Sequence, residues 1–117
     1  MARATSQKFP RKVRIVSSSD FQMLYRSGVK INSERFVLFG RKNEIGCHRL
    51  GITVSKRIGG AVVRNRIKRL FREIFRRSYN DIPGQLDIVI NAKAGCVGAS
   101  YWDLRAEFLA AVQKIKA

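Results

Sequence analysis

The sequence predicts an α/β chain, more closely an α+β sandwich, in which helices cover a small mixed sheet. One observation is the order of the hydrophobic patterns: segments with the helical period and with the strand period follow one another as α-β-β-α-β-α. A second is the length, because 117 residues suffice for one domain with its own core. A third is the long helix between the last two strands, which should run parallel if they share the sheet.

The chain is expected to divide into a basic N-terminal arm, residues 1–16, and a single folded domain, residues 17–117. The arm carries Pro10 and few apolar core candidates, so we expect it to be flexible when no partner is bound. It lacks the apolar centre of a signal peptide, but it is rich in Arg and Ser and free of acids, so a mitochondrial presequence is a competing interpretation. No apolar run approaches the roughly 20 residues of a membrane span, and we expect a cytoplasmic protein.

The first helix is predicted between Ser17 and Gly28. Ser17 can cap its N-terminus, with Asp20 as the acidic partner of a capping box, and Gly28 suits its C-terminus. Spacings of three and four residues place the apolar side chains of this helix on one face. These side chains are Phe21, Leu24 and Tyr25.

Three strands are predicted at residues 34–42, 49–56 and 86–93, because side chains alternate between two faces along each of them. One face is apolar and should meet the core. It comprises Phe36, Leu38, Leu50, Ile52, Val54, Leu86, Ile88 and Ile90. The other face is mixed. It comprises Val37, Phe39, Arg49, Gly51, Thr53, Ser55, Asp87, Val89 and Asn91.

The longest helix is predicted at residues 61–78 and is amphipathic. Its apolar side should pack on the sheet and comprises Val63, Ile67, Leu70, Phe71, Ile74 and Phe75. Its other side is cationic: Arg64, Lys68, Arg72 and Arg76 form a row at four-residue spacing, with Asn65 and Arg69 beside it and Arg66 and Arg77 at the far edge. Only Glu73 offsets the repulsion within this face.

A final helix begins near Ser100, where Asp103 can complete a second capping box. Its buried stripe comprises Tyr101, Leu104, Phe108, Val112 and Ile115. The two cysteines, Cys47 and Cys96, lie far apart without the spacing of a zinc site, so we expect neither a disulfide framework nor a metal centre, and a reducing compartment fits.

The charge balance points to a polyanionic partner. The chain has 24 Lys and Arg against 8 Asp and Glu, a formal net charge of +16, and such self-repulsion opposes a compact state unless an anion relieves it. Nucleic acid is favoured over an acidic protein or an anionic membrane. A merely solvated helix face is the simpler alternative, but nearly every polar position of the long helix has the same sign. Lys56 and Arg57, in the glycine-bearing loop before it, add cations where helix N–H groups also favour phosphate.

The stretch "VSKRIGGAVVRNRIKRLFREIFR" resembles the signature of the bacterial ribonuclease P protein subunit, with the Arg-Asn-Arg core at Arg64, Asn65 and Arg66. The stretches "RIVSSSDFQMLYRSG", "FVLF", "RLGITVSK" and "LDIVINAK" are similar to the family's first helix and strands, so the resemblance covers roughly residues 14 to 115. It implies a ribosomal-protein-S5-like sandwich with a left-handed βαβ crossover, where general handedness rules predict a right-handed one.

The resemblance also implies a function. The family protein is the small subunit of a ribonucleoprotein endonuclease that removes the 5′ leader from precursor tRNA. Its catalytic RNA carries the Mg²⁺ chemistry, and the protein binds both that RNA and the leader. We therefore expect no cofactor on the protein itself, no small-molecule substrate, no membrane and no obligate protein partner.

Two binding surfaces are expected. The first, for the phosphates of the catalytic RNA, comprises Lys56, Arg57, Arg64, Asn65, Arg66, Lys68, Arg69 and Arg72, because Arg forms bidentate phosphate contacts and Asn a directional hydrogen bond. The second is a leader-binding groove on the mixed sheet face, where aromatic side chains can stack unpaired bases. It comprises Phe21, Tyr25, Val37, Phe39, Thr53 and Val89. The alternative for Phe21 and Phe39 is a purely structural place in the core.

No catalytic residue is expected in this chain. A protein nuclease needs grouped carboxylates for metals or general acid–base groups, whereas the eight carboxylates are scattered and His48, expected in a surface loop, has no evident partner. A ribosomal protein or general RNA chaperone would share the charge without needing a groove. A helix-turn-helix DNA-binding protein is disfavoured because the basic helix lies between strands.

Overall fold

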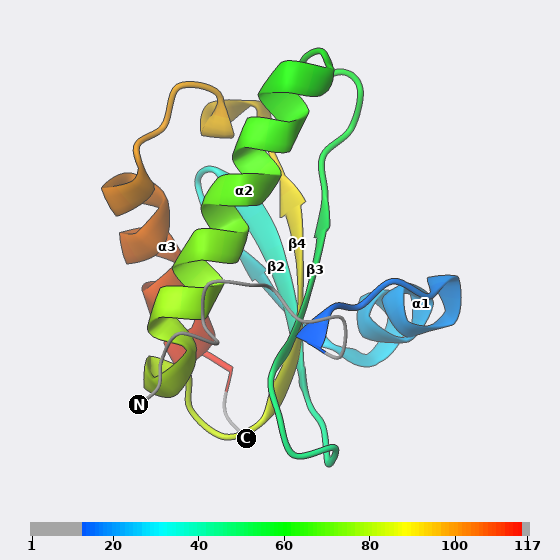
Figure 1. Cartoon of the computed structure of the whole chain (residues 1–117). Helices are drawn as coiled ribbons and strands as arrows, with labels where there is room; N and C mark the ends of the chain where they lie inside the picture. Colours follow the sequence, from blue (N-terminus) through cyan, green and yellow to red (C-terminus); the bar gives the residue numbers. More distant parts are fainter. Residues whose placement is uncertain (1–12, 116–117) are drawn as a thin grey trace.

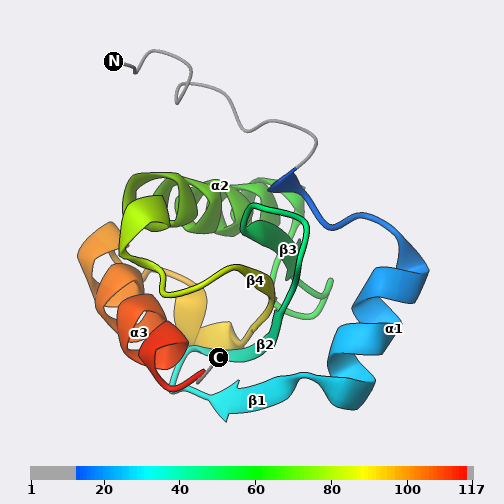
Figure 2. The ribbon, with the colours of Figure 1, turned by 90° about the horizontal axis from the view of Figure 1, so that it is seen from below.

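The computed structural model describes residues 13–115 and confirms the small mixed sheet covered by helices (Figure 1). The helices are α1 (Ser18–Ser27), α2 (Ala61–Ser78) and α3 (Tyr101–Gln113). The strands are β1 (Val29–Asn32), β2 (Phe36–Lys42), β3 (Arg49–Thr53) and β4 (Leu86–Ala92). Two short 3₁₀ turns, η3 (Tyr79–Asp81) and η4 (Ala94–Cys96), flank β4. Helix α1 lies on one face of the sheet, and α2 and α3 lie on the other (Figures 1 and 2).

The sheet has the strand order β1-β2-β4-β3. β3 and β4 are parallel neighbours joined through α2, as predicted, and the other pairs are antiparallel. β1 was not predicted, so the observed order gains one strand directly after the first helix. It pairs with β2 at the sheet edge and is four residues long, so its alternation of two apolar with two polar residues is too short to indicate a strand.

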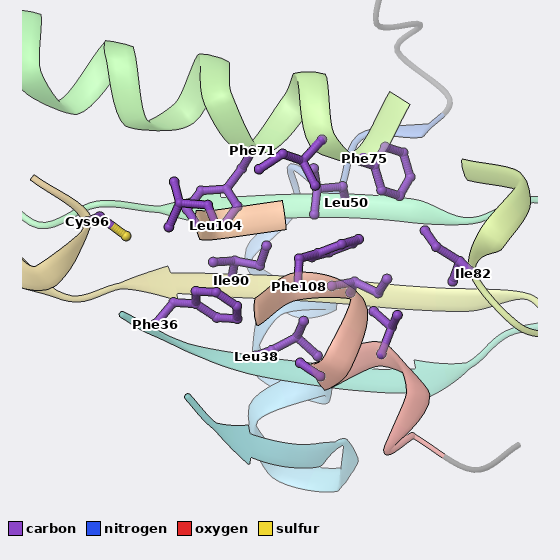
Figure 3. Packing of buried hydrophobic residues seen from close by; sticks show 14 of the residues in the cluster. Phe36, Leu38, Leu50, Phe71, Phe75, Ile82, Ile90, Cys96, Leu104 and Phe108 are labelled. Carbon is purple, nitrogen blue, oxygen red and sulfur yellow. The ribbon is translucent and has the colours of Figure 1, made fainter. Parts of the chain in front are cut away.

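The main core lies between the sheet and the pair α2 and α3 (Figure 3). Ile67, Phe71, Ile74 and Phe75 of α2 are buried, which confirms its predicted apolar side. The predicted stripe of α3 is buried too, apart from the half-buried Tyr101. Because the apolar side of α2 packs in this core, the cationic side of α2 points away from it and forms the site described below.

The serines of both predicted capping boxes, Ser17 and Ser100, are the N-cap residues of α1 and α3. The Asp20 N–H donates to the Ser17 Oγ and the Asp103 N–H donates to the Ser100 Oγ, each at 3.1 Å. Gly28 ends α1 in an extended conformation rather than a left-handed one. A Cβ there would lie 2.6 Å from the Leu24 carbonyl oxygen, so glycine is needed for a close approach of the helix end to the sheet.

The folded domain begins earlier than residue 17. Val13 and Ile15 are buried, Arg14 forms a parallel bridge with Leu50, and the Ile15 N–H donates to the Leu50 carbonyl at 2.9 Å. Residues 13–15 therefore belong to the domain, because Val13 packs in the main core and Ile15 packs under α1. The rest of the predicted arm lies outside the described residues.

The prediction that His48 lies in a surface loop is wrong. Its side chain is only 5 % exposed, its Nδ1 accepts a hydrogen bond from the Leu86 N–H at 3.1 Å, and its ring packs edge-on against Tyr79 at 4.7 Å. Burial lowers the pKa of His48. The neutral imidazole therefore ties the start of β3 to the start of β4, and its role is structural.

Candidate nucleic-acid interface

Helix α2 carries the first predicted surface, which we call the basic face. Arg66, Arg69, Arg72 and Asn65 are exposed on it, and Arg64 and Lys68 are half-buried at its border with the sheet. Lys56 and Arg57 are exposed in the loop that leads from β3 to α2. The structure thus brings all eight predicted residues onto one helix and its entry loop, because the apolar side of the same helix is held by the core.

Four of the eight carboxylates form ion pairs, and these pairs lie away from the centre of the basic face. Glu73 pairs with Arg76 and Arg77 at the C-terminal end of α2, and the hydrogen bond from Arg76 together with Arg77 lowers its pKa. Asp20 and Asp87 pair with Arg49 on the sheet, and Glu107 pairs with Arg35. Within residues 13–115, no carboxylate forms an ion pair with Arg66, Lys68 or Arg69.

Two arginines of the basic face are held in place by their surroundings. The Arg64 Nε donates to the Gly59 carbonyl at 3.1 Å, which bends this side chain back over the entry loop. Partial burial and the neighbouring guanidinium of Arg14 lower the pKa of Arg72. Arg14 and Arg72 line the same hollow beside β3, so positive charge is concentrated there and a bound anion would relieve the repulsion.

The sheet face under α1 is built from three cross-strand rows, which the strand registers define. One row consists of Arg41, Asp87 and Arg49. The middle row consists of Phe39, Val89 and Gly51. The third row consists of Val37, Asn91 and Thr53. The predicted groove residues thus come from two of these rows, together with the two aromatic residues of α1.

Helix α1 closes the middle row. Val89 is fully buried with Leu24 and Ile15, so the prediction that Val89 floors an open groove is wrong. The ring of Phe21 lies directly on Gly51, where a Cβ would come within 2.8 Å of its Cζ. The ring of Phe39 meets Tyr25 edge-on with centroids 5.0 Å apart. Phe21 and Phe39 thus have a structural place and remain partly exposed, and Tyr25 is exposed.

The third row, which we call the open row, is not covered in the same way. Thr53 is exposed, and Val37 and Asn91 are half-buried. Tyr25 is 37 % exposed. Its hydroxyl donates to the Asn91 Oδ1 at 3.1 Å, and the Thr53 hydroxyl donates to the same oxygen. The predicted groove is therefore confined to the open row and the neighbouring aromatic edges.

Two surface hollows run along the outer edge of β3 and connect both surfaces. One, of about 270 Å³, is lined by Arg14, Ile15, Val16, Phe21, Leu50, Gly51, Ile52 and Arg72. The other, of about 390 Å³, is lined by Ile52, Thr53, Val54, Ser55, Lys68, Asn91 and Ala92. Both hollows contain Ile52, and we call them together the β3 trough. Cations of α2 form one wall, and the aromatic and polar groups of the sheet face form the other.

Sequence reasoning missed several residues of this trough. Asn91 was placed on the correct sheet face by strand alternation, but nothing in the pattern showed that it would sit opposite Thr53 and within reach of Tyr25. Arg14 was assigned to the arm, and Gly51 was placed on the mixed sheet face without a role in the groove. The alternation along the last strand, combined with a register, would have found Asn91.

Two further features bear on function. In the part of the chain that the structure describes, no three His, Cys, Asp or Glu side chains come together as metal ligands. None of the helices over the same residues is long and apolar enough to cross a membrane.

The fold and the site define a small, strongly basic α+β protein of the polyanion-binding class, in which a cationic helix borders an aromatic and polar sheet face. Comparison with known families places it further: the family model described as Ribonuclease P matches residues 9–116. The chain belongs to this family, and the resemblance drawn from the sequence is confirmed.

Individual relatives agree with this family. The ribonuclease P protein component of Brevibacillus brevis is 45 % identical over 86 residues, which cover 73 % of this chain and 68 % of that protein. The ribonuclease P protein structure from Thermotoga maritima matches with a TM-score of 0.81 and 33 % identity, covering 89 % of this chain and 98 % of that one. The structure from Staphylococcus aureus matches with a TM-score of 0.77 and 32 % identity, covering 88 % and 96 %.

Proposed function

We propose that this chain is the protein subunit of a cytoplasmic ribonuclease P, which binds the catalytic RNA through the basic face and the 5′ leader of precursor tRNA through the β3 trough. The catalytic chemistry and its Mg²⁺ belong to the RNA in this proposal. The protein contributes binding and orientation of the two RNA segments.

One observation carries the proposal: the basic face borders the open row along a single strand, and its Arg66, Lys68 and Arg69 form no ion pair with a carboxylate among residues 13–115. A duplex or structured RNA presents regularly spaced phosphates, which suit the four-residue row of Arg64, Lys68 and Arg72. A single-stranded leader presents unstacked bases, which suit the aromatic edges and hydrogen-bonding groups of the trough.

The test is reconstitution with a catalytic RNA of the family. At a low Mg²⁺ concentration that limits the RNA alone, the protein should raise the rate of precursor tRNA cleavage at the mature 5′ end. A basic protein of equal charge and unrelated fold serves as the control. Equal stimulation by both proteins would favour the rival function, a general RNA chaperone or ribosomal protein, and would overturn the proposal.

The proposed division of labour has a second test in affinity. The protein should increase the affinity of the reconstituted enzyme for precursor tRNA that carries a leader, and should change its affinity for mature tRNA little. If both substrates gained equally, the trough would not be a leader site and the protein would act only through the catalytic RNA.

A further inference from the structure

Asn91 occupies the centre of the open row and has a defined hydrogen-bonding polarity. It stands between Val37 of β2 and Thr53 of β3, in register with both. Its Oδ1 accepts from the Tyr25 hydroxyl at 3.1 Å and from the Thr53 hydroxyl. A carbonyl oxygen has two lone pairs, so two donors satisfy it fully.

The Nδ2 amide of Asn91 is therefore the group that remains for a ligand. Among the hydrogen bonds of residues 13–115, none uses this nitrogen as a donor. Asn91 lines the larger hollow of the β3 trough together with Lys68. A half-buried amide donor beside a cation suits a nucleotide whose phosphate meets Lys68 and whose base offers an acceptor to Asn91.

We propose that Asn91 determines sequence preference within the single-stranded RNA bound in the trough, by donating its Nδ2 hydrogen to an acceptor atom on one base. The inference deepens the proposed function and rests on it, because the RNA in question is the 5′ leader. Tyr25 and Thr53 act as positioning residues, since their hydroxyls fix which end of the amide faces the trough.

This assignment differs from the contribution of the aromatic edges. Stacking on Phe21, Tyr25 or Phe39 accepts any base, because every base has a π face. A hydrogen bond to a base edge discriminates, because the wrong base leaves the half-buried donor without an acceptor. Affinity for the leader and preference within it should therefore be separable by mutation.

The experiment measures cleavage of precursor tRNA with a randomised leader by the reconstituted enzyme, scoring relative kcat/KM for each base at each leader position. The wild-type protein should show a base preference at one position, and Asn91→Ala should reduce that preference about three- to tenfold, as expected for one lost neutral hydrogen bond. Preferences at other positions should stay as they are.

Two matched variants sharpen the result. Asn80 is exposed in η3, away from the trough lining, so Asn80→Ala makes the same chemical change and should leave the whole profile unaltered. Tyr25→Phe keeps the ring but removes one of the hydroxyls that orient Asn91, and should weaken the same preference by a smaller factor. Melting temperatures of all variants should lie close to that of the wild type.

Three outcomes would overturn the inference. They are a wild-type profile with no base preference, an Asn91→Ala profile identical to that of the wild type, and an equal weakening at every leader position. Each can occur while the wild-type protein still stimulates leader removal, so failure of this inference is distinguishable from failure of the proposed function, which would abolish that stimulation.

Discussion

Removing three unpaired cations from α2 should cost a large and calculable part of the affinity for the catalytic RNA. The variant combines Arg66→Ala, Lys68→Ala and Arg69→Ala, three side chains without a carboxylate partner among residues 13–115. Alanine is the best helix former and none of the three lies in the core, so α2 should remain folded. Each phosphate contact contributes about 0.7–0.9 to the slope of log K against log salt.

Three lost contacts should therefore make that slope shallower by about two to three units, and lower the affinity at 0.1 M salt by about two orders of magnitude. The assay is filter binding or fluorescence anisotropy of the catalytic RNA over a series of salt concentrations. The control variant replaces Arg26, Lys30 and Lys42 by Ala. These residues are exposed on α1, β1 and the end of β2, and replacing them lowers the formal net charge of +16 by the same three units. Equal slopes for the two variants would refute a localised basic face and leave only diffuse attraction.

Other expected outcomes follow from particular contacts. Replacing Gly51 by Val should push the Phe21 ring off β3, destabilise the protein by about 1–3 kcal/mol in urea unfolding and selectively weaken binding of leader-bearing precursor tRNA; unchanged stability would contradict the contact. The folded-state pKa of His48 lies below its ordinary 6.5, so the unfolded chain takes up a proton at a higher pH than the folded protein does. The contribution of His48 to stability should therefore be full above pH 6.5 and fall as the pH drops below it. Unfolding curves at pH 5.5 and 7.5 should show this dependence for the wild type and not for a His48→Asn variant. Burial raises the pKa of the Cys96 thiol to about 11, so iodoacetamide at pH 7.5 should alkylate Cys47 well before Cys96. Mass spectrometry measures the two rates, and equal rates would show that the core opens readily. Sulfate should raise the melting temperature more than chloride at equal ionic strength, and identical midpoints would leave only screening at the basic face.

The sequence was most informative where hydrophobic periodicity is strong. The bounds of α2 agree with the predicted residues 61–78, and the predicted parallel pairing of β3 with β4 is confirmed. The short β1 escaped detection because four alternating residues are too few to establish a strand period, and its pairing with β2 is what defines it.

The site was predictable in composition but not in depth. Strand alternation placed Val89 and Asn91 on the same face, and yet one is fully buried and the other faces the trough. The difference arises because the apolar side chains of α1 pack on the middle row, whereas α1 contacts the open row through the Tyr25 hydroxyl. The position of a helix over a sheet depends on tertiary contacts such as that of Phe21 with Gly51. The structural role of His48 was likewise invisible, since its partners lie on β4 and η3.

The outer edge of β3 has a consequence for the behaviour of the free protein. An edge strand presents backbone groups that can pair with another copy of the same strand, and natural proteins guard such edges with charge or with a covering segment. Among residues 13–115, the segment around Arg14 and Ile15 pairs with this edge at Leu50, and Lys68 and Arg72 line the hollows along the rest of the strand. Under the proposed function, the positive charge that would draw RNA to this edge would also keep two copies of the protein from joining their sheets, and RNA bound in the trough would then protect the edge itself.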